Sequence, residues 1–158
     1  YTLYQTKMDK WMAENIDKDF AKNRAKAMSL LQEEASLQEI VRLVGRDSLS
    51  YEDQLKLEAT KSIREDYLQQ NAFHEIDTFC SHAKQNKMLK LVLEFYDLGM
   101  KALEKGVYLK DIEKMKVREK IARSKYIDEE ELFKIDDIIT ELNEAIEKLI
   151  QEGGILDA

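Results

Sequence analysis

Apolar residues recur three or four positions apart along most of this chain, which is the spacing of one face of an α-helix. The pattern predicts a short helix within residues 8–16 and a long helix over about 19–44 that ends at Gly45. A third helix is expected to begin at Ser50, because Asp53 three positions later completes an N-cap signature. The first part of the chain is therefore predicted to be helices joined by short polar turns.

Three further helices are predicted downstream. Thr78 or Ser81 could cap a fourth helix that Gly106 closes, and the apolar residues of 109–121 mark a fifth. Asp128 is expected to cap a sixth. No internal repeat and no linker rich in Pro, Gly or Ser interrupts the series. The predicted fold class is all-α, a compact bundle of about six helices.

The long second helix has one apolar stripe, which is expected to face the core. Its members are Phe20, Ala27, Leu30, Leu31, Leu37, Ile40, Val41 and Val44. With the third helix it should form a protruding antiparallel hairpin, whose turn is exposed at the end. The residues of this turn are Arg46, Asp47, Ser48, Leu49 and Ser50. The helical domain is expected to occupy 19–152, and GGILDA (153–158) is expected to be a disordered tail.

Composition supports helices and limits the classes of partner. The chain has five glycines and no proline, so an all-β fold would lack its usual turn residues. The net charge is −7 and the basic residues are scattered, which argues against nucleic acid as a partner. No run of 18 apolar residues occurs, so direct membrane insertion is not expected. A single cysteine fits a reducing compartment, and a start at Tyr1 suggests a piece of a longer protein.

One stretch, LQQNAFHEIDTFCSHAKQ (68–85), differs from the charged helices around it. His74, Asp77, Cys80 and His82 raise the hypothesis of a metal site, but zinc ligands usually come in paired spacings that are missing here. Cys80 and His82 also make a poor catalytic pair, because such residues normally lie far apart in sequence. No phosphate-binding loop motif is present. We therefore expect neither a metal site nor a catalytic centre in this chain.

A ligand pocket is the better hypothesis for this stretch. Phe73 and Phe79 could clasp a flat heteroaromatic group, while the amides of Gln69, Gln70 and Asn71 contact its edge. The alternative is that both rings belong to an ordinary packed core. Taken alone, the pattern favours the core.

Three blocks of sequence carry a resemblance to a known family. They are LLQEEASLQEIVRLVG (30–45), IREDYLQQNAFHEIDTFC (63–80) and VREKIARSKYIDEEE (117–131). Together they resemble the C-terminal helical domain of the catalytic A subunit of archaeal and vacuolar-type rotary ATPases, over nearly the whole chain. Residues 1–18 are similar to the segment that follows the nucleotide-binding domain of that subunit.

A weaker similarity links two motifs to the F-type catalytic subunit. DSLSYED (47–53) matches its acidic lever motif DELSEED, and LQQNAF (68–73) matches its LSQPF with one residue inserted. The resemblance implies that Phe73 and Phe79 form the adenine-side wall of an ATP site. It also implies that Gln69, Gln70 and Asn71 lie near the base, and that residues 46–50 contact the central stalk. Ser48 and Tyr51 replace two glutamates of the lever motif, so torque through charges at those two positions is not expected.

The resemblance also implies a function and partners. The parent subunit would bind ATP with Mg and couple ATP hydrolysis or synthesis to translocation of H⁺ or Na⁺. Its partners would be the other A and B subunits of the hexamer and the central stalk subunit, in a cytoplasmic, peripheral part of a membrane-bound complex. The isolated chain should not hydrolyse ATP. The alternative hypothesis is a stand-alone helical interaction module without a nucleotide role.

Overall fold

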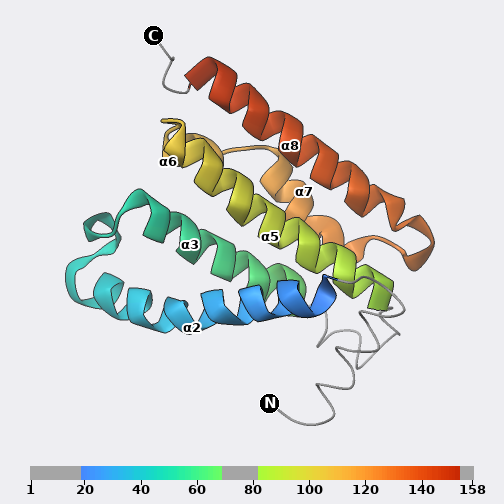
Figure 1. The fold of residues 1–158 in the computed structure, drawn as a ribbon, viewed down its shortest axis with the longest axis horizontal. Helices are drawn as coiled ribbons and strands as arrows, with labels where there is room; N and C mark the ends of the chain where they lie inside the picture. Colours follow the sequence, from blue (N-terminus) through green and yellow to red (C-terminus); the bar gives the residue numbers. More distant parts are fainter. Residues whose placement is uncertain (1–18, 69–81, 154–158) are drawn as a thin grey trace.

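The structure is a computed structural model that describes residues 19–68 and 82–153. Figure 1 shows the helices of these two stretches. The α-helices are α2 (Phe20–Val44), α3 (Tyr51–Ser62), α5 (His82–Glu104), α6 (Leu109–Glu113), α7 (Val117–Arg123) and α8 (Phe133–Gly153). Shorter elements are the 3₁₀ turns η1 (Arg46–Ser48), η3 (Ser124–Tyr126) and η4 (Glu129–Glu131), and the π-helical segment η2 (Ile63–Leu68). The described part contains helices and turns without strands, so the predicted all-α bundle is confirmed.

Helix α5 forms the centre of the bundle. It packs between α3 and α8, while α2 covers α3 and α5 from one side and α7 packs against α8 (Figure 1). Its buried apolar residues cover an arc of about 200° around the helix at 100° per residue, wider than the stripe of a surface helix, as expected for a central helix. They are Met88, Leu89, Leu91, Val92, Leu93, Phe95 and Ala102. Helix α8 instead buries one stripe, consisting of Ile135, Ile138, Leu142 and Ile146. The core therefore lies along α5.

The α2–α3 hairpin has the turn chemistry that was predicted. Gly45 ends α2 with φ 93° and ψ 159°, a backbone conformation that only glycine adopts without strain. Ser50 begins α3, and its hydroxyl accepts a hydrogen bond from the Asp53 backbone N–H at 3.2 Å. Both helix ends are therefore confirmed.

The end of α5 is also as predicted. Gly106 has φ 90° and donates its backbone N–H to the Leu103 carbonyl, while Val107 donates to Ala102, each at 3.0 Å. These two bonds form a Schellman motif, which satisfies carbonyls that the helix end leaves without partners.

Two helix predictions are wrong in detail. The expected fifth helix is broken into α6 and α7, because Ile112 and Val117 are both buried. Residues five apart lie roughly 140° apart around a continuous helix, so the break lets both reach the core. The expected sixth helix begins later than Asp128. That residue precedes the 3₁₀ turn η4 without a side-chain cap, and α8 begins at Phe133.

The apolar stripe of α2 is covered only in its first half. Phe20, Ala27 and Leu30 are buried, whereas Ile40 and Val44 are exposed, so their assignment to the core is wrong. Helix α2 has 25 residues and is about 37 Å long, so its last turns extend beyond the helices that cover its start. The prediction of a protruding hairpin is consistent with this exposure.

The predictions for residues 8–16, Thr78 and Ser81 lie outside the described residues. Gly153 is the last residue of α8, and residues 154–158 also lie outside. Within residues 19–68 and 82–153, no helix is long and apolar enough to cross a membrane.

Candidate functional site

The residues predicted to contact adenine cannot be compared with the structure. Gln69, Gln70, Asn71, Phe73 and Phe79 all lie outside the described residues. The same holds for His74, Asp77 and Cys80 of the metal hypothesis, while the backbone of His82 begins α5. Among the residues that the structure describes, no group of three or more His, Cys, Asp or Glu side chains could hold a metal ion.

The elements on either side of residues 69–81 are described. The π-helical turn η2 precedes this segment and α5 follows it, and these two elements contact each other at the end of the bundle opposite to η1 (Figure 1). Ile63 at the start of η2 is 1% exposed. Short π-helical turns occur frequently at functional sites. The two elements that flank residues 69–81 thus both belong to the packed body of the domain.

Hydrogen bonds also connect these two flanking elements through the chain between α7 and α8. The Lys84 ammonium, on the first turn of α5, donates hydrogen bonds to the backbone carbonyls of Lys125 at 2.9 Å and Ile127 at 2.7 Å. Lys84 is 2% exposed, so these carbonyls replace the water that its charge loses on burial. The Lys125 ammonium donates in turn to the Glu65 carbonyl in η2 at 3.4 Å. The connection between α7 and α8 therefore joins η2 to the start of α5.

Asp66 is a buried acid in η2 and is 6% exposed. Burial raises the pKa of its carboxyl group, while the charge of Lys125 and a hydrogen bond with Ser62 partly oppose this rise. Removing a carboxylate from water costs free energy that these partners recover only in part. Asp66 is therefore expected to make the stability of this end of the bundle depend on pH.

Replacing Asp66 with asparagine should stabilise the fold more at about pH 7 than at about pH 4. The folded pKa lies above the unfolded value of about 3.9, so Asp66 favours folding at low pH. That contribution is lost as the pH rises through the folded pKa. The unfolding free energy of the variant minus that of the unaltered chain should therefore become more positive as the pH rises. Urea unfolding across this range checks the sign, and a difference that falls with pH would contradict it.

The other candidate site lies at the tip, the turn between α2 and α3. Asp47, Ser48 and Ser50 are exposed there, as predicted. Leu49 is 8% exposed and therefore buried, and Arg46 is half-buried. The prediction that all of residues 46–50 are exposed is thus wrong for these two.

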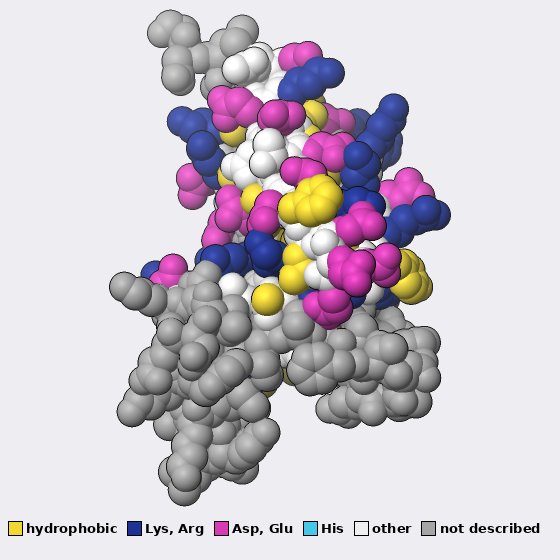
Figure 2. Space-filling view, turned by 90° about the vertical axis from the view of Figure 1, so that its right-hand side faces the viewer, with side chains coloured by type: hydrophobic (Ala, Val, Ile, Leu, Met, Phe, Trp, Pro, Cys, Tyr) yellow, Lys and Arg dark blue, Asp and Glu magenta, His cyan; other side chains and the backbone are white. Residues whose placement is uncertain are grey.

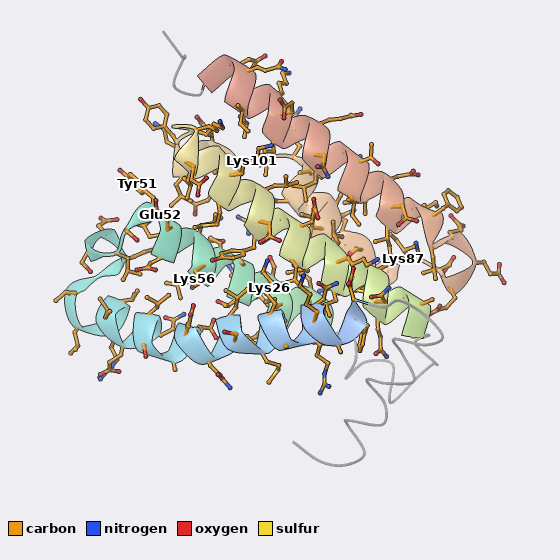
Figure 3. All side chains as sticks on the ribbon, viewed as in Figure 1. Lys26, Tyr51, Glu52, Lys56, Lys87 and Lys101 are labelled. Carbon is orange, nitrogen blue, oxygen red and sulfur yellow. The ribbon has the colours of Figure 1, made fainter. Side chains whose placement is uncertain are left out.

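Exposed apolar side chains next to the tip were missed by the sequence analysis. Leu43 is 69% exposed and Val44 67% in the last turn of α2, and Tyr51 is 65% exposed at the start of α3. Figure 3 shows Tyr51 beside Glu52 at this end of the molecule. In the sequence, Leu43 lies off the apolar stripe of the helix, and this departure could have indicated an exposed apolar side chain. Three exposed large apolar side chains within residues 43–51 indicate a candidate interaction surface.

Ion pairs join the helices that connect the two ends. The lysines labelled in Figure 3 include Lys26, Lys56 and Lys87, which lie on α2, α3 and α5. Their partners are Asp97 on α5 at 2.5 Å, Glu33 on α2 at 2.7 Å and Asp136 on α8 at 2.6 Å. The hydrogen bond with Glu33 raises the pKa of Lys56. On the face shown in Figure 2, acidic and basic side chains are interspersed.

Comparison with known proteins identifies the family. Residues 9–113, about two thirds of the chain, match the family described as the C-terminal domain of V and A type ATP synthase. All 158 residues align with V-type ATP synthase alpha chains. The identity is 61% for Clostridium botulinum and for alpha chain 1 of Clostridium tetani, and 60% for Clostridium perfringens. The chain spans 27% of the length of these relatives. The resemblance found in the three sequence blocks is thus confirmed, and the chain belongs to the family of C-terminal domains of V- and A-type ATP synthases.

Proposed function

We propose that this chain is the lever domain of the catalytic alpha chain of a rotary ATP synthase. One end of the domain would supply the adenine-side wall of the ATP site through Phe73 and Phe79, with Gln69, Gln70 and Asn71 near the base. The other end would press on the central stalk. Movement at the nucleotide site would thereby be converted into rotation, or the reverse.

The arrangement of the two ends is the observation that carries this proposal. The described elements on either side of residues 69–81, η2 and the start of α5, lie at one end of the bundle, and the tip lies at the opposite end (Figure 1). Helices α3 and α5 run between them and approach each other closely. A Cβ atom added to Gly99 on α5 would lie 2.8 Å from Leu55 Cδ2 on α3. Such close packing supports motion of the domain as one body, because packed interiors transmit displacement with little compression.

The composition of the tip supports a contact with another protein. Asp47, Ser48 and Ser50 are exposed beside Leu43 and Val44, so polar and apolar groups are both accessible. This mixture is typical of protein interfaces, in which an apolar centre has a polar rim. We therefore extend the proposed stalk contact to the last turn of α2. Arg46 and Leu49 are directed into the domain and contribute less to that contact.

The remaining parts of the proposal follow from membership in the family. The parent subunit would bind ATP with Mg through a phosphate-binding domain that lies outside this chain, and it would assemble with other A and B subunits into a hexamer. The complex would translocate H⁺ or Na⁺ and would place this domain in a cytoplasmic, peripheral position. The chain by itself would have no ATPase activity.

Site-directed crosslinking tests the contact between the tip and the stalk. In the assembled enzyme, with Cys80 changed to serine, the substitution Ser48→Cys should give a crosslink to a cysteine on the stalk. The exposure of Ser48 at the turn is the physical reason. The proposed lever is refuted if Ser48→Cys fails in every rotational state while a reference pair elsewhere on the stalk reacts.

A further inference from the structure

A chain of ion pairs connects the tip to the body of the domain. Nη2 of Arg46 lies 2.9 Å from Oε2 of Glu113 and 3.4 Å from Oε1 of Glu58. The second oxygen of Glu58, Oε2, lies 3.1 Å from Nη2 of Arg118. The Arg118 guanidinium in turn lies 4.9 Å from the ring centroid of Phe95. Charges of opposite sign thus alternate from the tip to a ring that is 0% exposed at the centre of α5.

These contacts join five elements from three separate parts of the chain. Arg46 belongs to η1, Glu58 to α3, Glu113 to α6, Arg118 to α7 and Phe95 to α5. The pair between Arg46 and Glu113 spans 67 positions in sequence, and that between Glu58 and Arg118 spans 60. The four charged side chains are 20–39% exposed, so salt screens them less than fully exposed pairs.

From this arrangement we infer that Arg46 is a positioning residue, which holds the tip against α6 and α7 so that a force on the tip reaches α5. This inference rests on the proposed lever function. The resemblance to rotary ATPases suggested that Arg46 itself contacts the stalk, but its guanidinium is directed toward two carboxylates of its own domain. A guanidinium is suited to this role, because Nη2 carries two N–H donors and contacts both carboxylates. Asp47 and Ser48, which are exposed, remain the contact residues.

The test compares Arg46→Gln and Glu113→Gln with Arg123→Gln in the assembled enzyme. Arg123 is a matched control, because it is also an arginine but pairs with Glu119 within its own helix α7, outside the proposed stalk contact. The first readout is backbone amide exchange in residues 45–51, relative to residues 88–95 of α5. The second readout is the number of ions transported per ATP hydrolysed in sealed vesicles.

Loss of either partner should speed exchange in residues 45–51 by about two- to fivefold, the change expected when a partly exposed ion pair is removed. Exchange in residues 88–95 should be unchanged. Fewer ions should be transported per ATP, while hydrolysis without a gradient continues. The double variant should resemble Arg46→Gln, because that change already removes the pair with Glu113. Arg123→Gln should change neither readout.

Faster exchange at the tip with unchanged transport per ATP would overturn the inference, because Arg46 would then have a structural role only. Unchanged exchange would overturn it as well. The crosslink from Ser48→Cys separates these outcomes from failure of the lever itself. If that crosslink forms in the unaltered background and Arg46→Gln keeps full coupling, the inference fails while the proposed function stands.

Discussion

Replacing Phe95 with alanine should lower the free energy of unfolding by about 3–5 kcal/mol, the range for large-to-small changes of a buried aromatic residue. Phe95 is 0% exposed on the central helix α5, so the variant loses apolar burial and leaves a cavity between well-packed helices. It also removes the ring beneath Arg118, whose guanidinium lies 4.9 Å from the ring centroid. Urea unfolding of the purified chain, followed by circular dichroism, measures the loss.

Phe133 provides the matched control for this prediction. It is the same residue type but is 58% exposed at the start of α8. Phe133→Ala should change the free energy of unfolding by less than about 0.5 kcal/mol, as most surface substitutions do. Equal losses for the two variants would show that α5 is not the centre of the core.

The second large effect concerns nucleotide binding by the assembled parent enzyme. Phe79→Ala should raise KM for ATP by about fivefold to 150-fold, which corresponds to about 1–3 kcal/mol for one aromatic ring stacked on a base. The value of kcat should change less, because stacking on adenine is the same in the ground and transition states. Steady-state kinetics of the assembled enzyme measures both constants.

Phe79→Tyr is the control, because it keeps the ring face and should leave KM nearly unchanged. A packed-core role makes a different prediction. In that case Phe79→Ala would lower the free energy of unfolding by several kcal/mol, and with it the melting temperature, while the folded enzyme kept its KM. An unchanged KM for both Phe73→Ala and Phe79→Ala, with lowered melting temperatures, would remove these rings from the adenine wall.

Several helix ends could be predicted because their signals are local. Gly45 and Gly106 both have positive φ values and end helices α2 and α5. Ser50 caps α3 through a hydrogen bond to Asp53, three positions away. These predictions needed only the conformational freedom of glycine and the reach of a short side chain.

The candidate site was only partly predictable. The helix-end signals placed the turn at residues 46–50, and Asp47, Ser48 and Ser50 are exposed there, while the stalk contact came only from the resemblance to rotary ATPases. It did not indicate that Arg46 is directed inward. The partners of Arg46 in η1 are 12 and 67 positions away, and no local pattern identifies them. The adenine-wall residues in 69–81 remain predictions.

By itself, then, the sequence determined that this chain is an all-α domain of the V- and A-type ATP synthase family, together with the ends of α2 and α5 and the start of α3. Only the tertiary structure decided that the stripe of α2 is half exposed, that residues 109–121 form two helices, and that Arg46 joins the tip to α6. The reason is physical. Periodicity and capping act within one or two turns of chain, whereas burial and ion pairing depend on which distant segments the bundle brings together.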